Sequence, residues 1–527
     1  MLLVRLARIP AMLLRFALPF GVLTALVLAA AAHAQGPAPA DPPASRYGAM
    51  LLGTPEGVGL LEEGRAQMLA FRLDEAEATF RRLDAAEPGS PAAAYHRTIL
   101  ALWRALMAER EPYYGRFFAR ADSLDARLDA LPDSPWKTHF RAEIAFARAA
   151  LLAKQERFPR AALALRSAYN GFEANVRRYP DFVESYKGMG LCHVAVGAVP
   201  RSYRWILSVL GFGGSVPQGM AELARAATES RYNREEAALY LAAVDAVLNE
   251  RKAGAIEGVR RLYEGYRGSP MTAYLYAYLL LDARRADEAE ALLREAEAAQ
   301  QAPGVEDIPY VQYYLGEALF RQNRFDEVVG FFEGYARTYR GEALLAQAYL
   351  HAGLCREMLG AREAAEVHYR RVRSDRDLDS DQAALRDAER LLRRPMTETE
   401  RTLLRGQNLY DGGRYREAVA TLQPLFGEAG LPEVQRAEAA YRTARAYHAL
   451  GEGDEALRHY RLAVERPGDP LAKWGPWSQF YIGEVYEARG DGEAARQAYR
   501  AALAYEQPFD YHKGLEQRAR TALARLR

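Results

Sequence analysis

Residues 479–508, QFYIGEVYEARGDGEAARQAYRAALAYEQP, contain the pattern that decides the fold. Two stretches flank a turn at residues 489–491, and Pro508 follows the second stretch. Gly483 lies in the first stretch and Tyr499 in the second. A glycine on one helix lets a second helix approach closely, an aromatic ring fills the remaining space, and a proline ends the second helix. The sequence therefore predicts a pair of packed helices here.

The same arrangement recurs upstream in one frame, which gives six clear copies. Neighbouring copies are 37 residues apart from Gly316 to Gly353, 38 from Gly406 to Ala444 and 39 from Ala444 to Gly483. One helix pair cannot bury its apolar face alone, so repeated pairs are expected to stack. The predicted packing residues are Gly64, Ala76, Phe80, Gly316, Phe332, Gly353, Ala365, Tyr369, Gly406, Ala418, Ala444, Ala456, Tyr460, Gly483, Ala495 and Tyr499.

These positions resemble the tetratricopeptide repeat family, whose pattern is Leu-Gly, an aromatic residue three positions on, Ala-x-x-x-Phe and a closing proline. The resemblance covers most of the chain after about residue 57. It implies an all-α fold, an α-solenoid in which helix pairs form a right-handed superhelix. The spacing here exceeds the usual period of about 34 residues, so longer helices or loops are expected.

Residues 182–233 break the pattern. The series YPDFVESYKGMG at 179–190 and LGFGGSVPQG at 210–219 looks like the eukaryotic tetratricopeptide repeat protein 39 family. It also looks like a group of exported bacterial repeat proteins of unknown role. Either likeness implies another repeat scaffold and no reaction.

The N-terminus has the features of a secretory signal peptide. Arg5, Arg8 and Arg15 precede or border an uncharged run from Phe16 to Ala32, and an A-x-A pattern ends at Ala34. We predict cleavage after Ala34 and export to the periplasm or outer envelope of a Gram-negative-type bacterium. Because the run is also long enough to serve as a membrane span, an uncleaved anchor remains the alternative.

The predicted organisation follows from these signals. It comprises a signal peptide at 1–34, a linker at 35–56, N-terminal repeats at 57–180, degenerate repeats with a glycine-rich break at 181–308, repeats at 309–374, an extra helix with linker at 375–398, repeats at 399–508 and a capping helix at 509–527.

Composition and motifs argue against several function classes. The chain has 70 Lys+Arg and 69 Asp+Glu, a balance that does not favour binding of nucleic acid or anionic membranes. No HExxH, GxSxG or phosphate-loop motif occurs. Cys192 and Cys355 are expected to stay unbridged, because a solenoid separates distant repeats. We therefore expect no enzyme, cofactor or metal site.

The resemblance implies that the first helix of each pair lines an inner groove. Surface Tyr and Trp side chains suit partner recognition, although the same residues could pack between neighbouring repeats. The candidate groove residues are Tyr310, Tyr313, Glu317, Gln407, Tyr410, Tyr441, Arg445, His448, Trp477, Phe480 and Glu484.

The leading hypothesis is a scaffold of the cell envelope that binds a peptide or protein in this groove. An alternative is a repeat subunit of an outer-membrane assembly or polysaccharide-export machine. A remote alternative is a superhelical peptidoglycan-active enzyme, for which the repeats leave little space because they run to about 20 residues from the C-terminus.

Overall fold

The computed structural model describes residues 47–198, 211–248, 252–374, 378–428, 430–465, 473–505, 509 and 511–526. The predicted signal peptide and its cleavage site at Ala34 lie outside these residues. Every regular element in the described ranges is a helix. They form two compact units, with Met1–Leu279 and Leu292–Pro309 in unit 1 and Leu280–Ala291 and Tyr310–Arg527 in unit 2. The all-α prediction is confirmed.

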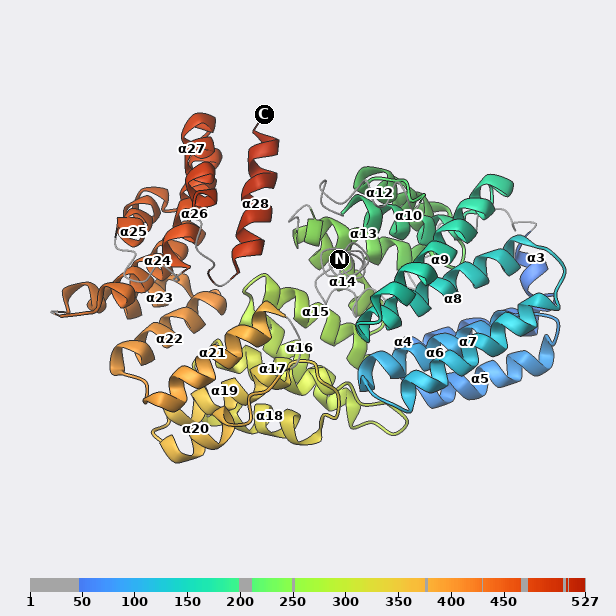
Figure 1. Ribbon diagram of the computed structural model, residues 1–527. Helices are drawn as coiled ribbons and strands as arrows, with labels where there is room; N and C mark the ends of the chain where they lie inside the picture. Colours follow the sequence, from blue (N-terminus) through green and yellow to red (C-terminus); the bar gives the residue numbers. More distant parts are fainter. Residues whose placement is uncertain are drawn as a thin grey trace, which may run out of the picture. The chain divides into compact units, whose positions relative to one another are not determined.

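Unit 1 consists of helices that pack in chain order: α4 on α5, α6 on α7, α8 on α9 and α10 on α12 (Figure 1). The helices are α3 (Gly48–Leu51), α4 (Pro55–Leu69), α5 (Leu73–Ala86), α6 (Ala92–Ala108), α7 (Tyr113–Asp129), α8 (Pro135–Lys154), α9 (Phe158–Arg178), α10 (Glu184–Gly197), α12 (Val216–Glu229), α13 (Arg234–Leu248), α14 (Lys252–Gly265) and α15 (Pro270–Asp282), whose end belongs to unit 2.

Unit 2 continues the same scheme, with α22 packed on α23, α24 on α25 and α26 on α27. Helix α21 lies where the sequence predicts an extra helix, and α28 lies where it predicts a cap. The helices are α16 (Ala286–Gln300), which ends in unit 1, α17 (Pro309–Phe320), α18 (Phe325–Thr338), α19 (Leu345–Met358), α20 (Arg362–Tyr369), α21 (Asp379–Arg393), α22 (Glu398–Asp411), α23 (Tyr415–Leu422), η2 (Gln423–Gly427), α24 (Glu433–Ala449), α25 (Gly453–Glu465), α26 (Trp474–Ala488), α27 (Gly492–Leu503) and α28 (His512–Arg525).

In several helix pairs a small residue of the first helix lies against a large side chain of the second. A Cβ added at Gly64 would lie 2.5 Å from the Phe80 ring, and one at Gly483 would lie 2.5 Å from the Tyr499 ring. The Phe80 and Tyr499 side chains are fully buried. In the α22–α23 pair Leu422 takes the place of the ring against Gly406. The α4–α5, α22–α23 and α26–α27 pairs are therefore each closed by a contact that has no room for a methyl group at the glycine.

The predicted linker at 35–56 is wrong for its described part. Tyr47 is buried, and its hydroxyl donates to Asp181 Oδ1 at 2.9 Å. Trp136 Nε1 donates to the Tyr47 carbonyl oxygen at 2.7 Å. Residues 48–51 then form α3, and α4 begins at Pro55. An aromatic residue that fits between repeats orders this segment, which the Pro- and Ala-rich sequence before it does not reveal.

The end of unit 1 returns to its first helix pairs. Glu306 N–H donates to the Phe71 carbonyl oxygen at 2.9 Å, and Arg104 Nη2 donates to Glu306 Oε2 at 2.9 Å. Ser269 Oγ also donates to the Leu69 carbonyl oxygen. These contacts join residues 200 or more positions apart and give unit 1 long-range ties besides those between successive repeats.

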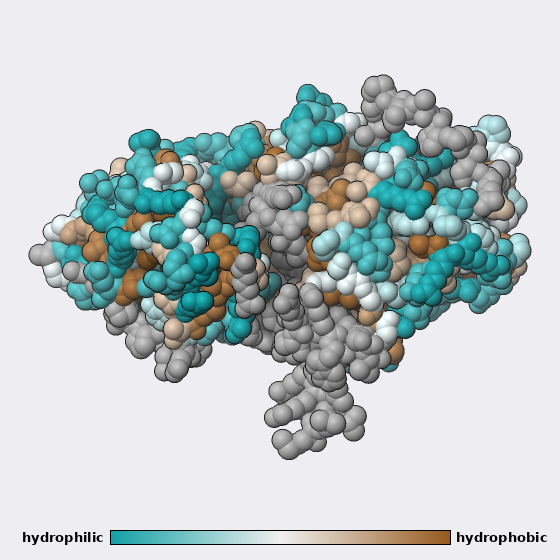
Figure 2. Space-filling model, turned by 90° about the horizontal axis from the view of Figure 1, so that it is seen from above, coloured by the Kyte–Doolittle hydropathy of each residue, from teal (hydrophilic) through white to brown (hydrophobic). Residues whose placement is uncertain are grey.

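Hydrophilic side chains predominate on the face shown in Figure 2, with hydrophobic residues in patches between them. In the described ranges the exposed large hydrophobic residues are Met50, Leu163, Leu359, Val367 and Tyr511. No helix that the structure describes has the length and apolarity to cross a membrane.

Two glycines of α4 provide a matched test of the close contact. We expect Gly64→Ala to lower the free energy of unfolding by about 1–3 kcal/mol, because its Cβ would overlap Phe80. Gly59→Ala adds the same methyl where no atom lies within 4 Å, so it should raise stability by about 0.5–1 kcal/mol through helix propensity. Thermal and denaturant unfolding measure the stability change of each variant. Equal changes for Gly64→Ala and Gly59→Ala would contradict the packing scheme.

Candidate functional site

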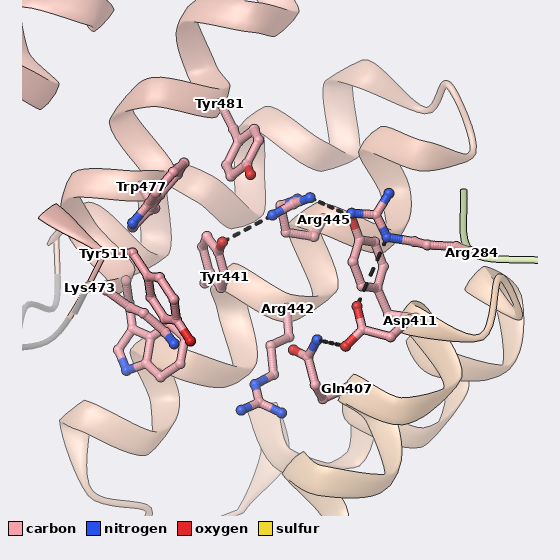
Figure 3. A pocket seen from close by; sticks show the side chains of 12 residues that line it. Arg284, Gln407, Asp411, Tyr441, Arg442, Arg445, Lys473, Trp477, Tyr481 and Tyr511 are labelled. Atoms are coloured by element: carbon pink, nitrogen blue, oxygen red, sulfur yellow. Dashed lines mark hydrogen bonds and ion pairs between the residues drawn. The ribbon is translucent and has the colours of Figure 1, made fainter. Parts of the chain in front are cut away.

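The first helices of three successive pairs in unit 2 present their side chains to one cavity of about 330 Å³ (Figure 3). Residues three and four positions apart share a face of a helix, so α22, α24 and α26 each contribute a short row. The lining residues are Gln407, Tyr410 and Asp411 from α22, Tyr441, Arg442 and Arg445 from α24, Lys473, Trp474, Trp477 and Tyr481 at or in α26, Tyr511 before α28 and Arg284 before α16.

Arg445 lies among three tyrosines at the centre of the lining. Its Nη1 donates to the Tyr441 hydroxyl at 3.1 Å and its Nη2 to the Tyr410 hydroxyl at 2.5 Å. The guanidinium carbon lies 3.9 Å from the centroid of the Tyr481 ring, a cation–π contact. Tyr410, Tyr441 and Tyr481 are each at least nine-tenths buried. The tyrosines therefore hold the guanidinium in one position.

One side of the lining combines a cation with aromatic rings (Figure 3). Lys473 Nζ lies 5.1 Å from the Trp474 ring centroid and 5.0 Å from that of Tyr511. Trp477 stacks on Tyr481 with ring centroids 5.8 Å apart. Tyr511 is 39% exposed, the largest exposure among the aromatic residues named here. This side of the lining thus offers wide apolar faces next to a positive charge.

The remaining polar residues pair at the edge of the pocket. Arg284 Nε lies 3.9 Å from Asp411 Oδ1, and Gln407 Nε2 donates to Asp411 Oδ2. Arg442 Nη1 donates to the Leu403 carbonyl oxygen at 2.6 Å, and its Nη2 pairs with Glu438. Gly413 allows the turn after α22 to pass close to the Arg284 carbonyl oxygen, where a Cβ would collide. This turn fixes Arg284 beside the pocket.

The charges of the lining are unequal. Four lining residues are basic and one is acidic. Burial raises the pKa of Tyr481 and of Tyr410, so both hydroxyls keep their protons at neutral pH. The pocket is therefore rich in hydrogen-bond donors and carries a net positive charge.

Five of the eleven predicted groove residues meet at this pocket: Gln407, Tyr410, Tyr441, Arg445 and Trp477. Whether they bind a partner stays a prediction. Tyr410 and Tyr441 also pack between repeats, as the alternative interpretation of the tyrosines required.

The other six predicted residues do not line it, and most have packing roles. Tyr310 and Tyr313 are buried against Tyr339 and Tyr335, so the expectation that they are exposed is wrong. Phe480 is likewise buried, against Tyr499. The remaining three are partly buried and have side-chain partners: Glu317 pairs with Arg321, His448 contacts the Tyr460 hydroxyl and Glu484 pairs with Arg518.

Sequence reasoning missed seven lining residues. Trp474 and Tyr481 share a helix face with Trp477 and line the pocket. The prediction instead continued from Trp477 to Phe480 and Glu484, which are shifted by one residue from the pocket-lining positions. That row of aromatics was a signal available in the sequence. Arg284 had none, because only the folded chain brings it to α22. The others are Asp411, Arg442, Lys473 and Tyr511.

A second cavity of about 340 Å³ lies among α23, η2, α24 and α25. Its His459 ring stacks on Tyr447, with centroids 5.5 Å apart. Thr443 Oγ1 and His459 Nδ1 have no hydrogen-bond partner but are sealed from solvent. A ligand could reach these two polar atoms only after rearrangement, so the first pocket is the stronger candidate.

A charge cluster in unit 1 is largely buried. Lys187 Nζ lies 2.7 Å from Glu236 Oε2 and 3.0 Å from Glu143 Oε2. Burial raises the pKa of Glu236 to about 7, although the nearby Lys187 opposes that shift. Lys187 and Glu236 are at most 3% exposed, so this cluster joins α8, α10 and α13 rather than presenting groups to a ligand.

The described residues contain no group of three His, Cys, Asp or Glu side chains placed to hold a metal ion. Cys192 and Cys355 are free and buried. Burial raises the pKa of both thiols, which keeps them protonated.

Comparison with solved structures finds repeat proteins over most of the chain at low identity. The TPR domain of P58(IPK) is 14% identical, with 89% of this chain and 97% of that chain covered and a TM-score of 0.21. The APC/C Cut9–Hcn1 hetero-tetramer is 14% identical, with 90% of this chain and 96% of that chain covered and a TM-score of 0.24. Yeast Tom70 is 12% identical, with 86% of this chain and 91% of that chain covered and a TM-score of 0.31. No family model and no curated protein matches the chain. Identities and TM-scores this low carry no information on function.

The pKa of His448, which follows Arg445 on α24, depends on the charge of Arg445. Burial, and then the charge of Arg445, lowers the pKa of His448 to about 4. We expect an NMR titration to show His448 neutral at pH 6 and protonating near pH 4. Arg445→Gln should move this pKa upward because it removes the neighbouring charge. A His448 pKa near 6.5 in the unaltered protein would contradict the described site.

Proposed function

We propose that this protein is a non-enzymatic scaffold of the bacterial cell envelope that binds a segment of a protein partner in the unit 2 pocket. The observation that supports this most is the set of Tyr and Trp side chains around Arg445. Aromatic residues and Arg are the residue types that dominate binding energy at protein interfaces. The cavity volume, about 330 Å³, lies at the lower end of the usual range for ligand pockets and suits a short part of a chain.

The tyrosines are ordered before any partner arrives. The Arg445 guanidinium joins Tyr410 and Tyr441 through hydrogen bonds and Tyr481 through its ring. A binding surface that is already rigid loses less conformational entropy when the complex forms. The same paired hydroxyls offer neither an activated nucleophile nor a base beside one, which favours binding over catalysis as the role of this site.

Export is the second part of the proposal, and the N-terminal sequence supports it. The basic start, the uncharged run to Ala32 and the A-x-A pattern at Ala34 are those of a secretory signal. We expect N-terminal sequencing of the protein from the envelope fraction of its host to begin at Gln35. A chain that begins at Met1 would support the membrane-anchored alternative, and recovery from the cytoplasm would contradict export.

Site-specific photo-crosslinking in the host tests the pocket. Benzoylphenylalanine at Tyr511, which is 39% exposed at the pocket, should give a discrete adduct with one partner, because the ring faces the bound segment. The control is the same group at Val367, which is 46% exposed on α20 and does not line the pocket. Mass spectrometry of the adduct should locate one recurring segment. Equal adducts from both positions would contradict a specific site.

A further inference from the structure

We propose that the unit 2 pocket recognises a carboxylate of the bound segment, received by the Arg445 guanidinium and the Tyr481 hydroxyl. This inference rests on the proposed function and names the chemistry of the group that the pocket takes. Three features of the pocket support it: the pairing of charges in the lining, the unused donors around Arg445 and the aromatic residues of the surrounding walls.

The pairing of charges singles out two cations. Arg442 pairs with Glu438, and Arg284 has Asp411 at 3.9 Å. Across the described part of the chain, no carboxylate lies within 4.0 Å of Arg445 or Lys473. By contrast, the partly buried Arg321 pairs with Glu317 at 2.9 Å. A charge that is largely removed from water is costly without a counterion. An incoming anion should therefore gain the most binding free energy by pairing with Arg445.

Arg445 still has donors to offer. A guanidinium has five N–H groups, and the two hydrogen bonds of Arg445 both go to neutral tyrosine hydroxyls. The Tyr481 hydroxyl has no hydrogen-bond partner among the residues that the structure describes. It lies on a side chain that is 6% exposed and lines the pocket together with Arg445 (Figure 3). A carboxylate has two oxygens and can accept from both groups at once.

The pocket suits a carboxylate better than a phosphate group. The Arg445 guanidinium and the Tyr481 hydroxyl match the two oxygens of a carboxylate, whereas a phosphate group presents three acceptor oxygens. The rings of Trp474, Trp477 and Tyr511 line the same space, so the acid should lie next to apolar atoms of the segment. Such a carboxylate can belong to an Asp or Glu side chain or to the C-terminus of the partner.

The test uses two random peptide libraries and the full-length purified protein. One library displays peptides with a free C-terminus, and the other holds them between fixed flanking sequences. We expect acids to be enriched among the bound peptides. Replacing the selected acid by its amide should raise the Kd about tenfold or more, because a charge-assisted hydrogen bond is lost. The library in which the effect is larger identifies the source of the carboxylate.

Three variants assign the effect to the pocket. In each variant the Kd of the amide peptide is divided by the Kd of the acid peptide. Arg445→Gln and Tyr481→Phe should each reduce this ratio, and Arg445→Gln should bring it close to one. Tyr481→Phe keeps the ring and removes a hydroxyl without a described partner, so its melting temperature should stay unchanged, which separates binding from folding. The control Arg500→Gln removes an exposed arginine of α27 outside the pocket and should leave the ratio unchanged.

The outcomes distinguish this inference from the function on which it rests. Peptides that bind the pocket without any acid preference would overturn the carboxylate inference and leave the scaffold function standing. An unchanged ratio in both Arg445→Gln and Tyr481→Phe, or stronger binding of a phosphorylated peptide, would also overturn it. If no peptide binds and no crosslink forms at Tyr511, both proposals fail.

Discussion

The structure depends on one repeated contact, in which a small residue of a first helix lies against a large side chain of the second. At Gly64, Gly353 and Gly483 an added Cβ would overlap the ring that follows 16 positions later. This contact sets the distance between paired helices, and the stacked pairs then bury their apolar faces. Because the ring occupies the inside of the pair, the first helix keeps another face free to contribute side chains elsewhere.

The unit 2 pocket is a consequence of that arrangement. The α22, α24 and α26 helices each hold their partner helix with one face and present residues such as Tyr410, Tyr441 and Tyr481 with another. Arg445 then links the three helices through two hydroxyls and one ring. The same residues therefore serve packing and binding at once, which explains why the two interpretations of the tyrosines were hard to separate from sequence. Replacing a whole tyrosine would disturb both roles, whereas removal of the Tyr481 hydroxyl alone touches only the pocket.

Much of the fold could be predicted, because helix periodicity and the Gly–aromatic spacing are local in the sequence. The extra helix α21 and the cap α28 also lie where the sequence predicts helices. The pocket was harder to predict for two physical reasons. Adjacent helix residues point about 100° apart, so a register error of one residue selected Phe480, which packs against Tyr499, instead of Tyr481, which lines the pocket. Arg284 reaches the pocket only through the tertiary contact of its turn with Gly413, a relation that no sequence period encodes.

Hydrogen–deuterium exchange on the full protein, with and without a synthetic peptide copy of its crosslinked partner segment, shows whether the partner binds in the unit 2 pocket. We expect slower exchange on binding in α24 from Tyr441 onward and in the first two turns of α26, where Trp474, Trp477 and Tyr481 lie. The second helices α25 and α27 should change little. Protection confined to unit 1, or to α25 and α27, would show that the partner binds elsewhere and would contradict the assignment of the pocket.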